Sequence, residues 1–466
     1  MNSVFDWFAS EELYPDLDAD AAVEHLSAAL RCRTVNFTDP GLTDFREFDR
    51  LQALMRESFP AVMRHGSFEV IGHSVLITLP GSDESLRPCL YMSHQDVVPV
   101  VAGTEKDWVC DAFSCAVADG SVWGRGALDI KNMVFGILEA AEYLLSRGAC
   151  FRRTAYLAFG EDEETLNLGA LAVSRELERR GVRLEFVLDE GGGKIEDGAI
   201  FGAPGTAVSL VSMMEKGYAD LELTVESEGG HSSRPFGGSS LEHLARAIAD
   251  ICDHPFPFRL PSALAATFEA LAPDITEEPL RSLVRDVRGN AAEIAACCAQ
   301  HRETFPYVTT TIAPTMIEGG SAACNVLPQN MRAVINFRLS EGETAESVLA
   351  HCRAAVRGEQ VKLRWMQANN PSSTARSDGY GYGKLLEALA PFFPEVHFVP
   401  ALSAGATDAH QYESICDTCL RCSPFMVETE DARTGVHGTN EHIPIRSYLQ
   451  GIRVLIQLME LANVNP

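Results

Sequence analysis

Four consecutive acidic residues, Glu-Asp-Glu-Glu at positions 161–164, follow an apolar stretch of this chain. That stretch, residues 154–159, has the pattern of a buried strand, and Gly160 marks its end. Because like charges repel one another at short range, such a run indicates either a solvated turn or a site for a cation. Three other stretches of the sequence bear on this choice.

Each of the three stretches is an apolar run that ends in a histidine or an acid. They cover residues 90–96, 124–129 and 186–190. The first and last have the pattern of strands, whereas the middle one leads into a helix. In an open α/β sheet such ends meet at one edge, where ligands bind. The sequence therefore predicts a metal site assembled from segments that lie far apart along the chain.

The length and charge of the chain limit the classes of protein it can belong to. Its 466 residues predict two domains, and a hydrophobic content of 46% with a charged content of 22% is typical of a soluble globular enzyme. The net charge of −27 argues against nucleic acid and anionic membrane surfaces as partners and favours a divalent cation. We find no run of the roughly 18 apolar residues that a transmembrane helix needs.

The N-terminus and the cysteines predict a cytoplasmic protein. Residues 1–7 have neither the basic nor the apolar segment of a signal peptide. The 13 cysteines show no disulfide framework, so reduced thiols are expected. Cys416, Cys419 and Cys422 share the spacing of part of an iron–sulfur loop but lack its second half. They form either a separate metal site or, as we expect, a set of buried structural thiols.

The order of the predicted elements indicates an α/β domain interrupted by a second domain. Up to about residue 212, strands alternate with amphipathic helices, as in a doubly wound α/β fold with a mixed sheet. The predicted strands cover residues 68–79 (a pair), 87–93, 154–159 and 184–188, and the predicted helices cover residues 21–31, 44–58, 132–147 and 168–180. After residue 367 the α/β pattern resumes, with a helix at 382–389, a strand at 396–399 that Pro400 ends, and a helix at 445–461.

Residues 213–367 follow a different order, which is strand, helix, strand, strand, helix, strand. This is the split βαβ, or ferredoxin-like, arrangement of an α+β domain. An Ala-rich helical stretch at 263–303 is interpreted as an insertion within this region. We therefore predict a discontinuous larger domain, residues 1–212 and 368–466, with an inserted domain at 213–367.

The side chains at the predicted site suit a pair of metal ions. The imidazole of His94 is a good zinc ligand, and Asp96 can hold its other ring nitrogen. Asp129 precedes the first turn of a helix, whose partial positive charge keeps the carboxylate ionised, and its two oxygens can bridge two metals. A second histidine is then required, for which we choose His437 over His442.

The remaining acids divide into ligands and a proton carrier. Glu163 and Glu164 point to opposite sides if the loop begins in an extended conformation, so one can bind metal while the other faces the substrate. Asp189 ends the next predicted strand, and we prefer it to Glu190 as a further ligand.

Six motifs resemble those of the metallopeptidase M20 family, and they follow one another in the family's order. The resemblance is greatest to its branch of carboxypeptidase S, aminoacylase and N-acyl-amino-acid hydrolases. Each motif alone is weak, but six in order over nearly the whole chain are specific. In one departure, Ile130 follows the bridging residue where members often have Asp or Met, at a position that is not a ligand. The motifs are His94-Gln-Asp96, Gly126-Ala-Leu-Asp129, Asp162-Glu163-Glu164, Asp189-Glu190-Gly191-Gly192, Gly230-His231-Ser232-Ser233 and His437-x-x-Asn440-Glu441.

The resemblance implies two zinc ions per chain, with cobalt or manganese as other occupants of the same donors. Asp129 matches the bridging ligand, Glu163 the general base, and Asp96 the residue that orients the first histidine. The ligands that the resemblance implies are His94, Asp129, Glu164, Asp189 and His437.

The resemblance also implies residues that contact the substrate. His231 matches a histidine that reaches the active site of the partner subunit in dimeric members. Asn325 and Arg338 lie where members hold the substrate carboxylate or oxyanion, and Gly405 begins a run like the family's Gly-rich pocket loop. The inserted domain would then be a lid and the surface through which a homodimer forms.

The function that the resemblance implies is hydrolysis of an amide bond in a small peptide or N-acyl amino acid with a free carboxylate. One alternative is a serine hydrolase built on Ser403, whose surroundings approach G-x-S-x-G but lack the first glycine and the matching His–Asp order. Another is a non-catalytic metal-binding protein. The presence of Glu163 argues against it, because a binding site needs no proton carrier.

Overall fold

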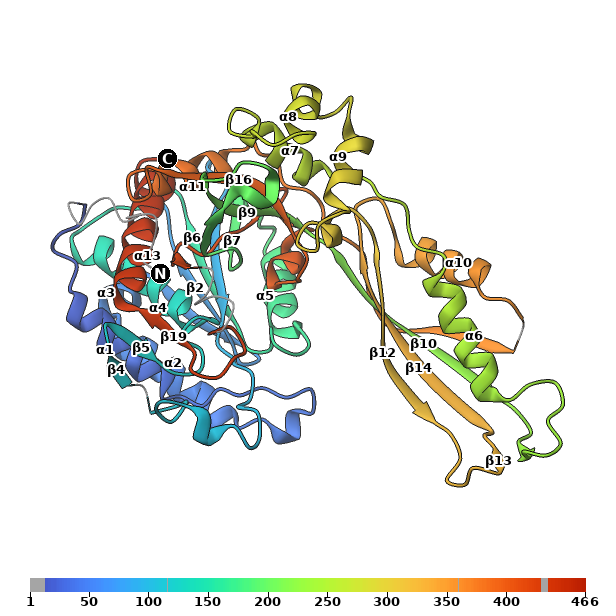
Figure 1. Ribbon diagram of the computed structural model, residues 1–466. Helices are drawn as coiled ribbons and strands as arrows, with labels where there is room; N and C mark the ends of the chain where they lie inside the picture. The colour runs from blue at the N-terminus through green and yellow to red at the C-terminus, as the bar shows by residue number, and fades with distance from the viewer. Residues whose placement is uncertain (1–12, 115, 359, 429–434) are drawn as a thin grey trace.

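The computed structural model describes residues 13–114, 116–358, 360–428 and 435–466. The chain forms a larger domain around a wide mixed sheet and a smaller, elongated inserted domain, which lies to its right in Figure 1. This architecture confirms the predicted α/β fold with an α+β insertion. None of the helices in these ranges is long and apolar enough to cross a membrane.

The sheet of the larger domain has parallel strands at its centre. Its order is β1-β2-β6-β3-β7-β17-β9-β8-β18, and β16 pairs with β9. The strands β6, β3, β7 and β17 run parallel to one another, whereas β2 is antiparallel to β6 and β8 to β9. These strands are β1 (Ser67–Ile71), β2 (Ser74–Leu79), β3 (Cys89–His94), β6 (Ala155–Gly160), β7 (Phe186–Asp189), β8 (Lys194–Asp197), β9 (Ala207–Glu215), β16 (Val396–Ser403), β17 (Cys419–Arg421) and β18 (Val427–Glu428).

Helices cover both faces of this sheet, which is the doubly wound arrangement. Because side chains alternate along a strand, Tyr91 of β3 joins the core on one face while Leu90 and Met92 join the core on the other. The first face is covered by α1 (Ala19–Leu30), α2 (Phe45–Ser58), α3 (Pro60–His65), α4 (Lys131–Ser146), α11 (Tyr380–Leu389) and α13 (Ile445–Met459), and the second by α5 (Leu168–Arg179) and the short helix η6 (Asp408–Tyr412).

The inserted domain is a four-stranded antiparallel sheet with two helices on one face. Its order, β15-β10-β14-β12, is that of a ferredoxin-like fold. Side chains of β10 alternate between buried and partly exposed, so one face of the sheet packs against the helices in a separate core. The elements are β10 (Gly217–Glu226), α6 (Ser240–Cys252), β12 (Thr311–Gly319), β14 (Asn330–Leu339), α10 (Ala345–Ala355) and β15 (Val361–Asn369).

Two expectations about these segments are corrected. The helical stretch at 263–303 forms α7 (Ser262–Leu271), α8 (Leu280–Leu283) and α9 (Ala291–Cys298), whose apolar side chains belong to the core of the larger domain. Pro400 does not end its strand, because β16 continues to Ser403. Because β16 pairs with β9 alone, its other edge is open. The missing N–H of Pro400 therefore costs no hydrogen bond at that edge.

Two helical glycines give a matched test of the packing in the larger domain. A Cβ atom at Gly451 of α13 would lie 2.1 Å from the ring of Phe425, whereas one at Gly383 of α11 would meet nothing within 4 Å. Gly451→Ala is expected to destabilise the protein by about 1–3 kcal/mol, because the ring must move. Gly383→Ala is expected to stabilise it by up to about 1 kcal/mol. Urea denaturation measures both, and equal effects would contradict this packing.

Candidate active site

Three parallel strands end at one edge of the larger sheet and bring the predicted residues together. β3 and β6 pair in register as far as His94 opposite Gly160, so residues 161–164 begin beside His94. β7 pairs with the other side of β3 and ends at Asp189, which Glu190 follows. The strand ends converge as the sequence predicts.

The second histidine comes from the loop before β19 (His442–Pro444). β19 pairs with β5 (Ser121–Trp123), which places this loop beside the segment that carries Asp129. His442 stacks on Trp123 with ring centroids 4.1 Å apart, whereas the ring of His437 faces Asp129. His437, not His442, therefore lies at the site.

Two groups of side chains with metal-binding donor atoms lie at this edge, and Asp129 belongs to both. In the first, Nε2 of His94 lies 3.2 Å from Oδ1 of Asp129 and 3.3 Å from Oε1 of Glu190. In the second, Nε2 of His437 lies 3.0 Å from Oδ2 of Asp129 and 3.0 Å from Oε2 of Glu164. Each oxygen of Asp129 faces a different histidine, as in a bridging carboxylate.

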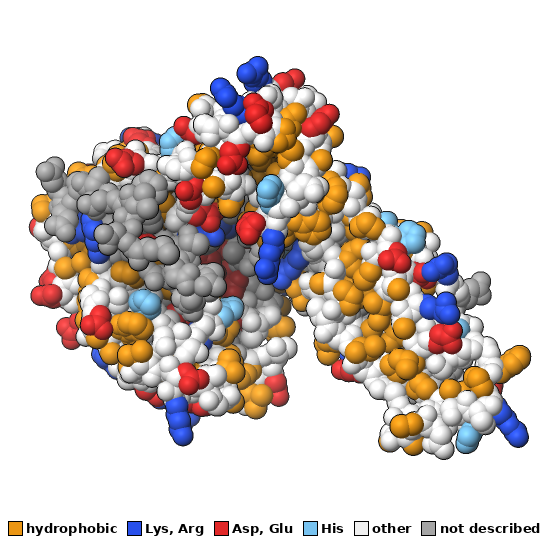
Figure 2. Space-filling model, viewed as in Figure 1, with side chains coloured by type: hydrophobic (Ala, Val, Ile, Leu, Met, Phe, Trp, Pro, Cys, Tyr) orange, Lys and Arg blue, Asp and Glu red, His pale blue; other side chains and the backbone are white. Residues whose placement is uncertain are grey.

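The donor set fits divalent metal ions. Within each group the donor atoms lie within 4.8 Å of one another, and they are imidazole nitrogens and carboxylate oxygens, which zinc, cobalt and manganese accept. Figure 2 shows acidic side chains gathered in a recess of the larger domain that faces the inserted domain. Because like charges gathered out of water are costly, a cation stabilises such a cluster.

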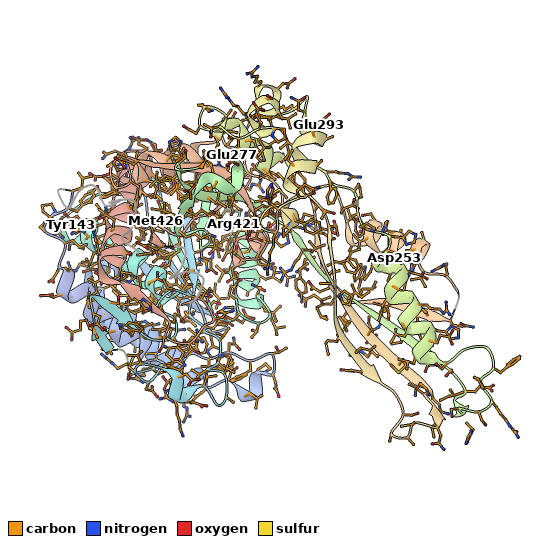
Figure 3. All side chains as sticks on the ribbon, in the orientation of Figure 1. Tyr143, Asp253, Glu277, Glu293, Arg421 and Met426 are labelled. Atoms are coloured by element: carbon orange, nitrogen blue, oxygen red, sulfur yellow. The ribbon has the colours of Figure 1, made fainter. Side chains whose placement is uncertain are left out.

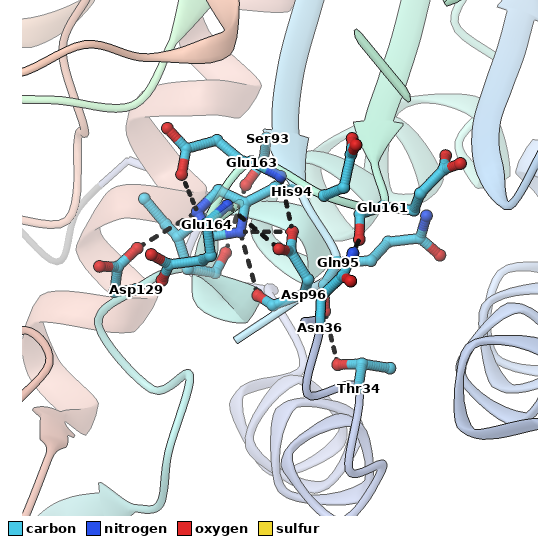
Figure 4. Close-up of polar contacts among 12 residues, drawn as sticks. Thr34, Asn36, Ser93, His94, Gln95, Asp96, Asp129, Glu161, Glu163 and Glu164 are labelled. Carbon is cyan, nitrogen blue, oxygen red and sulfur yellow. Dashed lines mark hydrogen bonds and ion pairs between the residues drawn. The ribbon is translucent and has the colours of Figure 1, made fainter. Parts of the chain in front are cut away.

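Asp96 fixes both the first histidine and the acidic run. Its Oδ1 lies 3.3 Å from Nδ1 of His94, and its backbone oxygen lies 3.0 Å from the same nitrogen. Its carboxylate also accepts hydrogen bonds of 3.1 Å from the backbone N–H groups of Glu163 and Glu164 (Figure 4). Asp96 is completely buried, so these contacts hold the histidine ring and the loop in a fixed relation.

Asp189 joins neither group, and its neighbour Glu190 takes the predicted place. Both oxygens of Asp189 accept hydrogen bonds of 2.8 Å from backbone N–H groups, one from Glu190 and one from Ala409. The carboxylate of Glu190, by contrast, lies against His94. The structure therefore replaces Asp189 with Glu190 in the candidate ligand set.

Glu441, which the sequence analysis noted only as part of a motif, holds the loops of the site together. Its carboxylate accepts a hydrogen bond of 2.6 Å from Nη1 of Arg125, and both residues are buried. It also accepts hydrogen bonds of 2.7–3.1 Å from the backbone N–H groups of Gly126, Leu128 and Asp129. The position of the shared carboxylate thus depends on Glu441.

A second buried ion pair links the site to the junction of the domains. Nε of Arg421 donates to Glu215 at 2.7 Å, and the hydroxyl of Thr407 donates to the same carboxylate at 2.6 Å. Arg421, labelled in Figure 3, is completely buried in the larger domain, and Glu215 is the last residue of β9 before the inserted domain. The sequence analysis missed this pair, because Arg421 lies among the cysteines.

Neighbouring charges set the pKa values of the two histidines. Burial lowers the pKa of His94, but the carboxylates of Glu190 and Asp129 more than reverse this and raise it well above its usual value. Hydrogen bonds to Asp129 and Glu164 raise the pKa of His437 to about 10. The carboxylates around each ring therefore favour a positive charge at this place, which a bound cation would supply.

Glu163 lies beside the two groups without belonging to either. Its Oε2 is 4.0 Å from Nε2 of His94. Burial and the nearby carboxylate of Glu190 raise the pKa of Glu163 well above its usual value. A raised proton affinity next to a metal-binding cluster is the property that a general base requires near neutral pH.

The predicted substrate residue Arg338 lies in β14, close to the junction of the domains. It donates a hydrogen bond of 3.3 Å to the carbonyl oxygen of Ala404, and its guanidinium lies 4.7 Å from the ring centroid of Tyr218. Gly405 is the next residue of that loop, and its N–H donates to the hydroxyl of Ser403. Arg338 and Gly405 therefore lie together.

His231 and Asn325 lie elsewhere, at the tip of the inserted domain. His231 belongs to β11 (Gly230–His231), which pairs with β13 (Val326–Leu327) at the lower right in Figure 1. The N–H of Ser232 donates to the carbonyl oxygen of Asn325 at 2.9 Å, so the two residues are neighbours. Both are exposed, and neither joins the cluster of its own chain.

The other candidate sites lack the partners their chemistry needs. The hydroxyl of Ser403 accepts from a backbone N–H, and none of the hydrogen bonds found in the described ranges joins it to a histidine. Cys416, Cys419 and Cys422 are buried free thiols. The metal-binding groups found among the described residues contain no cysteine.

Comparison with known proteins defines the class of this enzyme. The model of "Peptidase family M20/M25/M40" matches residues 90–461. The chain belongs to this family and is an M20-type metallohydrolase that acts on amide bonds, which confirms the resemblance seen in the motifs.

Relatives and solved structures agree with this assignment. The chain is 32% identical to N-fatty-acyl-amino acid synthase/hydrolase PM20D1.1 of Danio rerio, over 98% of this chain and 89% of that protein. It is 31% identical to PM20D1 of Homo sapiens, over 96% and 88%. An M20 family metallo-carboxypeptidase from Sulfolobus solfataricus shares the fold with a TM-score of 0.67 and 17% identity, over 95% and 98% of the two chains.

Removing the Glu441 carboxylate tests how the site is held. Glu441→Ala leaves the buried Arg125 without its partner and is expected to destabilise the protein by about 3–5 kcal/mol and to weaken metal binding. Glu387→Ala, which removes a half-exposed partner of Lys384, is the control and should cost at most about 1 kcal/mol. Urea denaturation and metal titration measure the two effects. Wild-type stability in Glu441→Ala would contradict this role.

Proposed function

We propose that this protein is a di-zinc hydrolase that cleaves the amide bond of an N-acyl amino acid with a free carboxylate. The observation that carries the proposal is the pair of histidine–carboxylate groups that share Asp129, with Glu163 beside them. The relatives named as N-fatty-acyl-amino acid synthase/hydrolases, which match nearly the whole chain, favour an N-fatty-acyl amino acid over a small peptide as the substrate.

The residues that would hold the metals divide between two sites. His94 and Glu190 would hold one metal ion, Glu164 and His437 would hold the other, and Asp129 would serve both. When bound, two zinc ions lower the pKa of a water molecule towards about 7 and polarise the carbonyl oxygen of the substrate.

Glu163 carries the proton in this proposal. It accepts a proton from the attacking water and returns it to the nitrogen of the leaving amino acid, so that the C–N bond breaks to give a carboxylic acid and an amine. Burial keeps the proton affinity of Glu163 high. Asp96 supports the step indirectly, because it positions the backbone of Glu163 and the ring of His94.

The inserted domain supplies the remaining contacts. Arg338 would bind the free carboxylate of the amino acid through its guanidinium fork, beside the loop that contains Gly405. His231 and Asn325, at the tip of the inserted domain, would stabilise the oxyanion at the active site of a second subunit. The proposal therefore includes a homodimer formed through the inserted domain. We also propose that the protein is cytoplasmic.

Glu163→Gln tests the proposed chemistry. The variant should lose about 100- to 10,000-fold in kcat because it cannot accept a proton, while it keeps its metal content. Release of amino acid from N-acyl amino acids measures turnover, and elemental analysis measures metal. Ser403→Ala, which removes the alternative nucleophile, should keep wild-type turnover. Full activity in Glu163→Gln, or loss of activity only in Ser403→Ala, would refute the mechanism.

A further inference from the structure

A cavity opens directly from the metal-binding cluster into the larger domain. Its volume is about 210 Å³, and two of its lining residues are Asp129 and Glu190. A scissile amide held at the cluster therefore has one of its ends beside this cavity.

The other described residues of the lining are apolar or uncharged. Leu128, Ile130, Phe425, Val427 and Val436 supply the apolar surface, and the remaining residues are glycine, serine and asparagine. Among the described residues that line it, none is Lys, Arg or His. The described lining residues therefore offer no cationic partner to a carboxylate, and their apolar surface favours an aliphatic group.

The inner wall is held rigidly. Phe425 is 2% exposed, and its ring fits between two helices at Gly136 and Gly451, where an added Cβ would lie 2.3 Å and 2.1 Å from ring atoms. A wall of this kind keeps its shape when the cavity is empty, which lowers the ordering cost of binding.

The opposite wall is backbone. Residues 191–193 are three glycines with positive φ, and a Cβ at Gly192 would lie 2.5 Å from the carbonyl oxygen of Leu210. Any other residue at Gly192 would be strained and would press on β9. Because glycine has no side chain, residues 191–193 fit between the cluster and β9 without filling the cavity.

We infer that this cavity is the binding site for the acyl chain of the substrate, and that its apolar residues determine which chain length is preferred. This inference rests on the proposed function and assigns the two ends of the substrate. The amino acid carboxylate lies towards Arg338 and the inserted domain, and the hydrocarbon chain lies between Phe425, Val427 and Val436. The competing occupant is an apolar amino acid side chain.

The inference predicts how catalysis depends on the acyl group. Wild-type kcat/KM should rise from N-acetyl- to N-dodecanoyl-phenylalanine, by at most about fourfold for each methylene that leaves water. Val427→Phe narrows the inner part of the cavity. Val436→Phe does so at the mouth, where the side chain is 45% exposed and a larger residue is tolerated by the fold. Each variant should lower kcat/KM at least tenfold more for the dodecanoyl than for the acetyl substrate.

The matched control is Val117→Phe, a valine that is 53% exposed on β4 (Ala116–Ala118) and lies outside the cavity lining. It should leave the preference for chain length unchanged. Equal losses on both substrates in the two cavity variants would overturn the inference. So would a selective loss that follows the amino acid side chain, since the cavity would then bind that group.

A binding measurement separates this inference from the proposed function. Dodecanoate, the acyl product, should bind the zinc-loaded wild type and Val117→Phe in calorimetry, and at least tenfold more weakly to Val427→Phe and Val436→Phe. If dodecanoate binds in this pattern but no N-acyl amino acid is cleaved, the cavity assignment stands and the proposed reaction fails. If dodecanoate does not bind, or binds all four proteins equally, the cavity assignment fails.

Discussion

The sharing of one carboxylate between two histidines is the interaction on which the rest of the site depends. His94 and His437 lie far apart in the sequence, yet Asp129 faces both rings. It can do so only if its own backbone is fixed. Glu441 provides that restraint through hydrogen bonds to the backbone around Asp129 and an ion pair with Arg125. A carboxylate without a metal-binding role thus determines where the metal-binding carboxylate lies.

The fold makes a concentration of negative charge tolerable. The ends of the parallel strands β3, β6 and β7 bring acidic residues to one edge of the sheet, and burial raises the pKa of Glu163 and Glu190, the latter to about 7. The carboxylates of Asp96 and Asp189, by contrast, accept hydrogen bonds from backbone N–H groups. The acids at this edge therefore divide into those bound to backbone and those that face the cluster.

The sequence predicted the parts of this arrangement that depend on strand ends and motif order. His94, Asp129 and Glu164 could be chosen because apolar runs point to a shared sheet edge. His437 could be chosen because the site requires a second histidine and because its motif resembles that of the family. Asp189 and Glu190 could not be distinguished in this way, because they are adjacent at the end of one strand. What separates them is a hydrogen bond to Asp189 from the backbone N–H of Ala409, which lies in a loop far along the chain. The helices at 262–298 were assigned to the wrong domain for a similar reason. Helix α7 packs on β16, more than a hundred residues further along the chain, and the other two join the same core.

Metal stoichiometry tests the shared carboxylate most directly. Zinc-loaded protein, freed of unbound metal and analysed by inductively coupled plasma mass spectrometry, should contain two ions per chain. Glu164→Ala should lose one of them, and Asp129→Ala should lose both, because the bridging ligand serves each site. A wild-type protein with fewer than two ions, or an Asp129→Ala variant that retains both, would contradict the account.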